Sequence, residues 1–278
     1  MHRTDVVSWR ATAALAALLV SLTACSSGSA HHARPRAHHV VVMAPSSAPA
    51  SLTLVRQRRL IGRSVRGRHI VVYRRGNLGA AERVLVVGCI HGTECAGIAI
   101  ARKLIRESLS RAFMLFVIPN LNPDGLAART RQNARGVDLN RNFPYHWVLE
   151  GYPWSTFYSG PRPLSEPETR TARRFVLYHQ PDITFWFHQH MNLVWASGGD
   201  LTLQRCFARL AGIRFRRLPA ISGSGNNWIN HRFPGHTSTV VELPAGSLPG
   251  RKVTRFAWAV RVLARWDAGR PDDGPCPA

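Results

Sequence analysis

The feature of this 278-residue sequence that most restricts its fold is a series of short runs made almost entirely of apolar residues. Runs of this kind are typical of strands that are buried on both faces, as in a parallel sheet covered by helices. They predict buried strands at residues 84–87, 113–118, 183–187 and 238–241. A further short strand is expected at Ile70–Tyr73, after a glycine-rich turn.

Helical patterns lie between these runs. They predict helices at residues 96–109, 203–210 and 253–266, and a helix that a capping box opens at Ser165 and that ends near His179. Strands that alternate with helices indicate an α/β fold with a mixed, mainly parallel central sheet. We expect one domain over residues 52–270, with a short tail at 271–278.

The N-terminal segment reads as an export signal. Basic residues Arg3 and Arg10 precede the apolar stretch 11–22, which is too short to span a membrane. It ends in Leu22-Thr23-Ala24-Cys25, which resembles a bacterial lipobox, so residues 1–24 are the expected signal peptide and Cys25 the lipidated residue. An ordinary cleaved signal, and hence a secreted protein, is the alternative. The Ser-, Ala-, Pro- and His-rich residues 25–51 are the expected flexible tether.

The chain is strongly basic, with 37 basic and 15 acidic residues and a net charge of +22. Loss of residues 1–24 removes Arg3, Arg10 and Asp5, which leaves 35 basic and 14 acidic residues and a net charge of +21. Such a charge favours an anionic environment such as lipid headgroups or an acidic wall polymer. No nucleic-acid-binding motif is evident, so nucleic acid is not an expected partner. The oligomeric state is left open.

Four cysteines follow Cys25. Outside the cytosol a disulfide can form, and Cys206–Cys276 is the favoured pair because it would fix the tail. Cys89 and Cys95 are expected to be small buried residues beside a candidate metal motif.

That motif follows the apolar run 84–87. His91 and Glu94 are three residues apart, so one tight turn can direct both side chains inward at the end of a strand. An imidazole nitrogen and a carboxylate oxygen suit zinc, which needs a third protein ligand and an open position for catalysis. Alone, this spacing is a weak signal and is more typical of a surface turn.

A third ligand is expected from another strand end. His188 directly follows the apolar run 183–187, whereas His190 lies two residues further on and could point to the same side. We favour His188, and expect the residues after it to form a loop.

Two further segments contain polar residues in apolar surroundings. Asn140 and Arg141 lie in the string Val137–Pro144, and an arginine with an asparagine can recognise a carboxylate. Glu242 ends the apolar run 238–241, where a buried carboxylate is costly unless it is paired or functional.

The ordered set of these motifs resembles the M14 zinc carboxypeptidases over residues 58–265. It comprises His91-x-x-Glu94, Asn122–Gly125, Arg131, Gly136–Pro144, Ser165–Glu168, His188 and Glu242. The resemblance implies a three-layer α/β/α sandwich with one zinc ion held by His91, Glu94 and His188. It also implies that Arg131 polarises the scissile carbonyl, that Asn140 and Arg141 bind a substrate carboxylate, and that Glu242 is the general base. The expected reaction is amide hydrolysis by a zinc-activated water.

One departure bears on the substrate. Digestive members of the family carry a tyrosine on the loop before the last strand, and the corresponding stretch 218–228 has none. This stretch is expected to be a loop. Without this tyrosine, the sequence is more similar to the bacterial murein peptide amidase branch. That resemblance implies cell-wall peptides as substrates, at the outer face of the membrane.

Two alternatives remain open. One is a zinc-dependent deacylase of N-acyl amino acids, similar to succinylglutamate desuccinylases and aspartoacylases, which share the His-Gly-x-Glu start. The other is a lipoprotein that binds the wall without catalysis.

Overall fold

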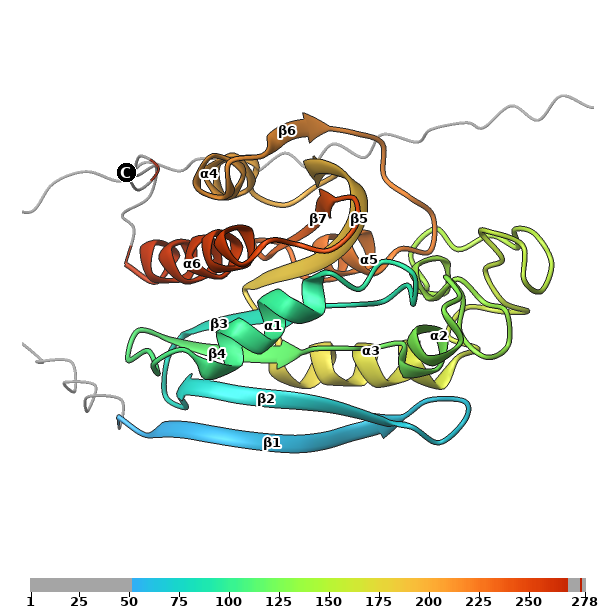
Figure 1. Ribbon diagram of the computed structural model, residues 1–278, viewed down its shortest axis with the longest axis horizontal. Coiled ribbons are helices and arrows are strands. Elements are labelled where there is room, and N and C mark those ends of the chain that lie inside the picture. Colours follow the sequence, from blue (N-terminus) through green and yellow to red (C-terminus); the bar gives the residue numbers. More distant parts are fainter. Residues whose placement is uncertain (1–51, 270–275, 277–278) are drawn as a thin grey trace, which may run out of the picture. The chain divides into compact units, whose positions relative to one another are not determined.

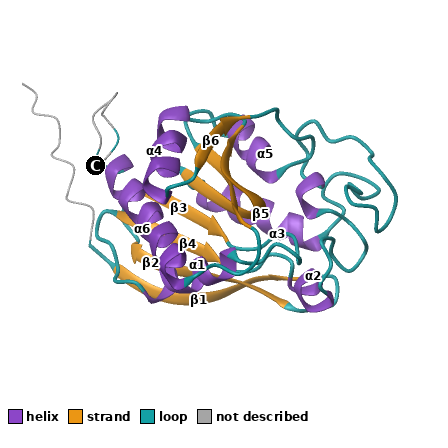
Figure 2. Ribbon diagram, turned by 45° about the horizontal axis from the view of Figure 1, so that its top comes forward, coloured by secondary structure: helices purple, strands orange, loops and turns teal. Residues whose placement is uncertain are grey.

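The computed structural model describes residues 52–269 and 276, which belong to a compact unit that spans Ser47–Ala278. Signal, tether and lipidation predictions for residues 1–51 lie outside the described residues. Figures 1 and 2 show a central twisted sheet with helices on both faces. The predicted α/β sandwich with a mixed, mainly parallel sheet is confirmed.

The sheet has seven strands. Their order is β1-β2-β4-β3-β5-β6, and β7 pairs with β5. Strands β1 and β2 pair antiparallel with each other, as do β2 and β4, while the remaining pairs are parallel. The bounds are β1 Leu54–Arg63, β2 His69–Asn77, β3 Glu82–Val87, β4 Phe113–Ile118, β5 Ile183–Ala196, β6 Arg214–Arg217 and β7 Thr237–Pro244.

Helices cover both faces of this sheet. On one face lie α1 (Gly97–Arg106), α4 (Leu201–Ala211) and α6 (Gly250–Asp267), and on the other lie α3 (Pro167–His179) and α5 (Gly225–Arg232). Neighbouring residues of β5 show why both faces are apolar: Phe185 packs in the first core and Trp186 in the second, and both are fully buried. The helix α2 (Pro123–Ala128) and the 3-10 turn η1 (Leu139–Arg141) lie in the connection between β4 and α3.

The predicted buried strands are all present, but β5 is much longer than its apolar run. The prediction of a loop after His188 is wrong, because the chain stays extended to Ala196 and its residues 193–196 pair with β6. The exposed residues His190 and Met191 interrupt the apolar pattern there, which conceals the strand in the sequence. The prediction of a loop over 218–228 is also wrong in part, since α5 begins at Gly225.

The start of α3 differs from the predicted capping box. Glu166 is the N-cap, Pro167 is the first helical residue, and no side chain caps the helix. Ser165 instead donates a 2.7 Å hydrogen bond to the Glu166 carboxylate. These two side chains serve a buried polar network described below, which explains why they are not available for capping.

Two disulfides involve the described residues: one joins cysteines 70 residues apart in sequence, and the other joins cysteines six residues apart. The predicted Cys206–Cys276 bond is present and ties the tail to α4. Cys89 and Cys95, expected to be small buried residues whose pairing the sequence leaves open, form a second disulfide around the candidate metal motif. Within the described part of the chain, no helix combines the length and apolar character needed to cross a membrane.

The end of α3 contains a histidine in an unfavourable place for a positive charge. The His179 ring packs against Phe116 and Phe175, with ring centroids 4.5 and 4.4 Å away. Burial, followed by the charges of Arg74 and Arg83, lowers the pKa of His179 from 6.5 to about 4.

We therefore expect the protein to lose stability as the pH falls from about 6.5 to about 4. In this range the unfolded chain protonates His179 and the folded chain does not, so acid favours unfolding. The His179→Gln variant should show a smaller decrease in the free energy of unfolding over this range, measured by urea unfolding at a series of pH values. His69→Gln, at an exposed position of β2, is the matched control. An identical pH dependence in the parent and in His179→Gln would contradict the prediction.

Candidate active site

The candidate site residues meet near the point where the parallel pairing of β3 with β5 ends, beside β7. His91 and Glu94 lie in the connection between β3 and α1, His188 lies in β5, and Glu242 lies in β7. Ligand sites form at the carboxyl edge of parallel strands because several chain segments converge there. The fold therefore brings together residues that are up to 151 positions apart, from His91 to Glu242.

Three predicted metal ligands form one cluster. The Glu94 Oε2 atom lies 2.9 Å from His91 Nδ1 and 3.1 Å from His188 Nδ1, and the two Nδ1 atoms are 3.2 Å apart. The possible ligand atoms of the three residues all lie within 4.8 Å of one another. His190, the alternative third ligand, is exposed and does not belong to this cluster.

Asp138 is a functional residue that the sequence reasoning missed. Its Oδ1 atom accepts a 2.8 Å hydrogen bond from His91 Nε2, and the carboxylate is fully buried. In the neutral ring, a hydrogen bond from Nε2–H to this carboxylate favours the tautomer in which His91 Nδ1 carries the lone pair, as metal-bound histidines require. The signal in the sequence was an acidic residue between Val137 and Leu139, both of which are buried.

The same contacts determine the charges in the cluster. Burial alone would lower the pKa of His91, but the charge of Asp138 and the hydrogen bonds to Asp138 and Glu94 together outweigh it and raise the pKa. Burial would raise the pKa values of Glu94 and Asp138, but hydrogen bonds and charges from the histidines, with Arg131 also acting on Asp138, hold both well below their usual range. Both carboxylates are therefore ionised near neutral pH.

This donor set fits a zinc ion. Two imidazole nitrogens and one carboxylate oxygen point to a common position, and the Asp138 contact leaves the His91 Nδ1 lone pair available there. Three protein ligands correspond to a catalytic rather than a structural zinc site, because a structural site uses four.

The segment with His91 and Glu94 is held close to its neighbours. The Cys89–Cys95 disulfide encloses both ligands in a short loop. Gly92 packs directly on the backbone of Gly125 in α2, and a Cβ atom on Gly92 would lie 2.0 Å from the Gly125 carbonyl carbon. A side chain at Gly92 would therefore push the ligand loop away from α2.

Arg131 lies at the cluster, where its side chain bridges two carboxylates. Its guanidinium donates to Glu94 Oε1 and, at 3.0 and 3.1 Å, to Asp138 Oδ2. The side chain keeps 22% of its surface exposed, so it borders both the metal ligands and solvent.

Asn140 and Arg141 lie next to each other in η1. Asn140 Oδ1 accepts a 3.0 Å hydrogen bond from Gly225 N, so a substrate carboxylate would have to meet its amide nitrogen instead. The Arg141 guanidinium packs over the ring of Phe157, 4.8 Å from the centroid, and 3.8 Å from Asp138 Oδ2. Phe157 was not predicted from the sequence; it covers Arg141 and, at 5.7 Å, Arg131.

A buried polar network holds this part of the chain in place. Asn142 Nδ2 donates to Ser165 Oγ at 2.9 Å, and its Oδ1 accepts from Thr169 Oγ1 at 2.7 Å. Glu166 Oε2 accepts from Asn133 Nδ2 at 2.8 Å. The Ser165–Glu168 motif thus positions the segment that carries Asn140 and Arg141, rather than taking part in chemistry itself.

Glu242 is held beside the cluster by strand register. In the parallel pairing of β5 with β7, His188 and Glu242 are direct partners. Glu242 is 9% exposed, and its Oε2 atom is buried without a hydrogen-bond partner among the described residues. A buried carboxylate oxygen without a partner is costly for stability, which points to a functional role.

We predict that His188→Ala loses most of the bound metal and that His190→Ala keeps most of it. Removal of one ligand from a three-ligand site sacrifices much of its affinity, whereas His190 is exposed outside the cluster. Metal content per chain, measured after dialysis by elemental analysis, distinguishes the two variants. The reverse result would assign the third ligand to His190.

Comparison with known proteins places this geometry in a family. A family model described as zinc carboxypeptidase matches residues 53–202. Among curated proteins, murein peptide amidase A of Escherichia coli K12 is 31% identical over 141 residues, which cover 46% of this chain and 57% of that protein. Human carboxypeptidase A6 is 28% identical over 160 residues, covering 47% of this chain and 37% of that protein. The chain thus spans less than two thirds of these relatives.

Solved structures share the fold. Carboxypeptidase A from Helicoverpa armigera superposes with a TM-score of 0.69 at 20% identity, over 79% of this chain and 70% of that one. Murein-tripeptide amidase MpaA from Escherichia coli O157 superposes with a TM-score of 0.63 at 24% identity, over 80% of this chain and 95% of that one. With the family model covering more than half of the sequence, the chain belongs to the zinc carboxypeptidase family, whose members are zinc-dependent hydrolases.

Proposed function

We propose that this zinc carboxypeptidase-family protein is exported and hydrolyses amide bonds in carboxylate-bearing peptides of the cell wall, with Glu242 as the general base. The observation that carries the mechanism is the Glu242 carboxylate. Its Oε2 atom is buried and without a partner, in direct register with the metal ligand His188.

Each residue of the site has a defined task in this reaction. When bound, zinc supplies a Lewis acid that activates water and polarises a carbonyl. Glu242 Oε2 accepts a proton from the attacking water and returns it to the departing amine nitrogen. Asp138 keeps His91 in the tautomer that the metal site requires.

Two arginines bind the negative charges that arise on the carbonyl oxygen and on the substrate carboxylate. Arg131, between Glu94 and solvent, places a guanidinium where negative charge develops on the carbonyl oxygen. Arg141 and the Asn140 amide bind a carboxylate of the substrate, and the Phe157 ring limits how far the Arg141 guanidinium can move. Together they favour a substrate with a free carboxylate near the cleaved bond.

Three observations support wall peptides as the substrate. Relatives of this chain in Escherichia coli and in Vibrio campbellii are named murein peptide amidases. Two disulfides suit an oxidising compartment outside the cytosol. The charge of +21 expected after removal of residues 1–24 suits an anionic wall.

We expect Glu242→Gln to reduce turnover by about 10²–10⁴-fold, because the amide has nearly the same shape but cannot accept the proton. Zinc content should be unchanged, since Glu242 is not in the ligand cluster. The measurement is the rate of amide cleavage with metal content determined on the same preparation. A folded, zinc-loaded variant with the parent rate would remove Glu242 from the mechanism.

The substrate is tested by mass spectrometry of defined muropeptides incubated with the zinc-loaded protein. The expected product set shows cleavage within the stem peptide. Cleavage of ordinary C-terminal peptides alone would keep the mechanism and refute the wall substrate. Activity on N-acyl amino acids alone would identify a deacylase instead.

The export part of the proposal is tested at Cys25. A lipid on the Cys25 side chain would retain the protein at the membrane, so Cys25→Ala should move it from the membrane fraction to the soluble fraction. Fractionation and mass spectrometry of the mature N-terminus measure this. Unchanged membrane association, with no lipid on the N-terminus, would contradict the anchor.

A further inference from the structure

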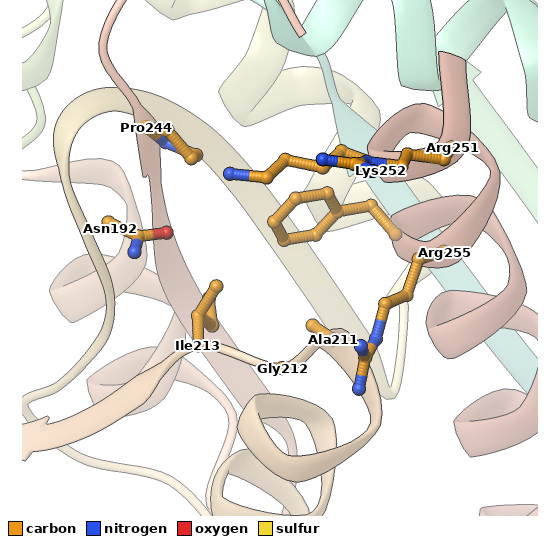
Figure 3. Close-up of a pocket in the computed structure, with 9 residues that line it drawn as sticks. Asn192, Ala211, Gly212, Ile213, Pro244, Arg251, Lys252 and Arg255 are labelled. Carbon is orange, nitrogen blue, oxygen red and sulfur yellow. The ribbon is translucent and has the colours of Figure 1, made fainter. Parts of the chain in front are cut away.

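We infer that a cavity beside the catalytic strands is a second binding site, for an anionic amino-acid or peptide group that carries both a carboxylate and an N–H donor. The cavity has a volume of about 300 Å³ and lies between the middle of β5, the turn from α4 to β6, the end of β7 and the first turns of α6 (Figure 3).

The cavity wall formed by α6 is strongly basic. Arg251, Lys252 and Arg255 all line it, and in Figure 3 the Lys252 side chain extends from the helix toward Pro244 and Asn192. No carboxylate among the residues of the described structure forms an ion pair with any of the three. Three uncompensated cations around one hollow create a site for an anion.

Their position in the helix does not compensate these charges, of which Arg251 and Arg255 are exposed to solvent and Lys252 is half-buried. All three lie in the first two turns of α6, where the helix dipole repels positive charge, and the first turn has neither an acidic residue nor a side-chain cap. A carboxylate in the cavity would meet both the cations and the positive end of the helix.

Arg255 is held in place by specific packing. Its Nε atom donates a 2.9 Å hydrogen bond to Leu210 O, and its guanidinium lies against Gly212. A Cβ atom on Gly212 would lie 2.6 Å from the Arg255 Cζ atom, and the φ of +69° at Gly212 also favours glycine. The turn after α4 is therefore shaped to admit this guanidinium at the cavity wall.

The opposite wall offers a hydrogen-bond acceptor. Asn192 Oδ1 is buried and has no partner among the described residues, and Figure 3 shows the oxygen directed into the cavity. A buried acceptor without a donor is costly, and a ligand N–H group would satisfy it. Cations on one wall and an acceptor on the other fit a carboxylate and an amine or amide of one molecule.

The cavity and the candidate active site are lined by residues of the same two strands, β5 and β7. Pro244 follows Glu242 by two residues in β7, and Asn192 follows His188 by four in β5. Gln189 links the strands, because its side chain donates a 2.9 Å hydrogen bond to Pro244 O. The inference rests here on the proposed function: the ligand is an acidic group of the substrate that lies away from the cleaved bond.

The direct test is calorimetric titration of the zinc-loaded protein with glutamate, which has two carboxylates and an ammonium group and no amide bond to cleave. Lys252→Gln/Arg255→Gln should weaken binding by about 10- to 100-fold, the range for the loss of hydrogen bonds to charged groups. Arg265→Gln, in the last turn of the same helix, removes an exposed arginine outside the cavity and should bind like the parent.

Asn192→Ala tests the acceptor. It should weaken the binding of glutamate and leave the binding of glutarate, which lacks the ammonium group, unchanged. Equal glutamate affinity in the parent and in the Lys252→Gln/Arg255→Gln variant would overturn the site. Sulfate binding as tight as glutamate, with no effect of Asn192→Ala, would overturn the ligand class.

The role in substrate binding is read from kinetics. With a substrate that has a free carboxylate remote from the cleaved bond, Lys252→Gln/Arg255→Gln should raise KM about 10-fold or more and leave kcat unchanged. The same substrate with that carboxylate amidated should show no change. A parent protein that cleaves no peptide would refute the proposed function, whereas the glutamate titration decides the cavity independently.

Discussion

The hydrogen bond between His91 and Asp138 is the contact on which the rest of the site depends. It joins the connection after β3 to the segment that ends in η1, and it is completely buried. Because Asp138 also accepts from Arg131 and lies near Arg141, one carboxylate contacts a candidate metal ligand and two arginines at once. Because the pKa of Asp138 is held well below its usual range, this carboxylate remains negatively charged near neutral pH and can pair with both arginines.

Much of the fold was predictable because the central strands are buried on both faces. Continuous apolar runs revealed β3, β4, β7 and the first part of β5. The edge strands β1 and β6 were not found, because their exposed arginines conceal any alternating pattern. The second half of β5 was missed because its pairing with β6 is a tertiary interaction that local sequence does not reveal.

The site was predictable to a similar degree and for related reasons. Residues that end apolar runs, such as His188 and Glu242, are conspicuous, and the structure places both at one edge of the sheet. Asp138 and Phe157 were not identified, since their importance lies in what they contact rather than in where they stand in the sequence. The Cys89–Cys95 pairing likewise depends on a turn geometry that spacing alone does not fix.

The register of β5 against β7 limits which insertions and deletions this enzyme can tolerate. His188 and Glu242 are partners in a parallel ladder, and their neighbours Phe187 and Val241 are buried in the core. In a strand, side chains alternate between faces, so a shift of one residue would turn either functional side chain into the apolar interior. An insertion or deletion in either strand would therefore break the register that places His188 and Glu242 side by side. We therefore expect changes in length to be tolerated in the loops rather than in these two strands.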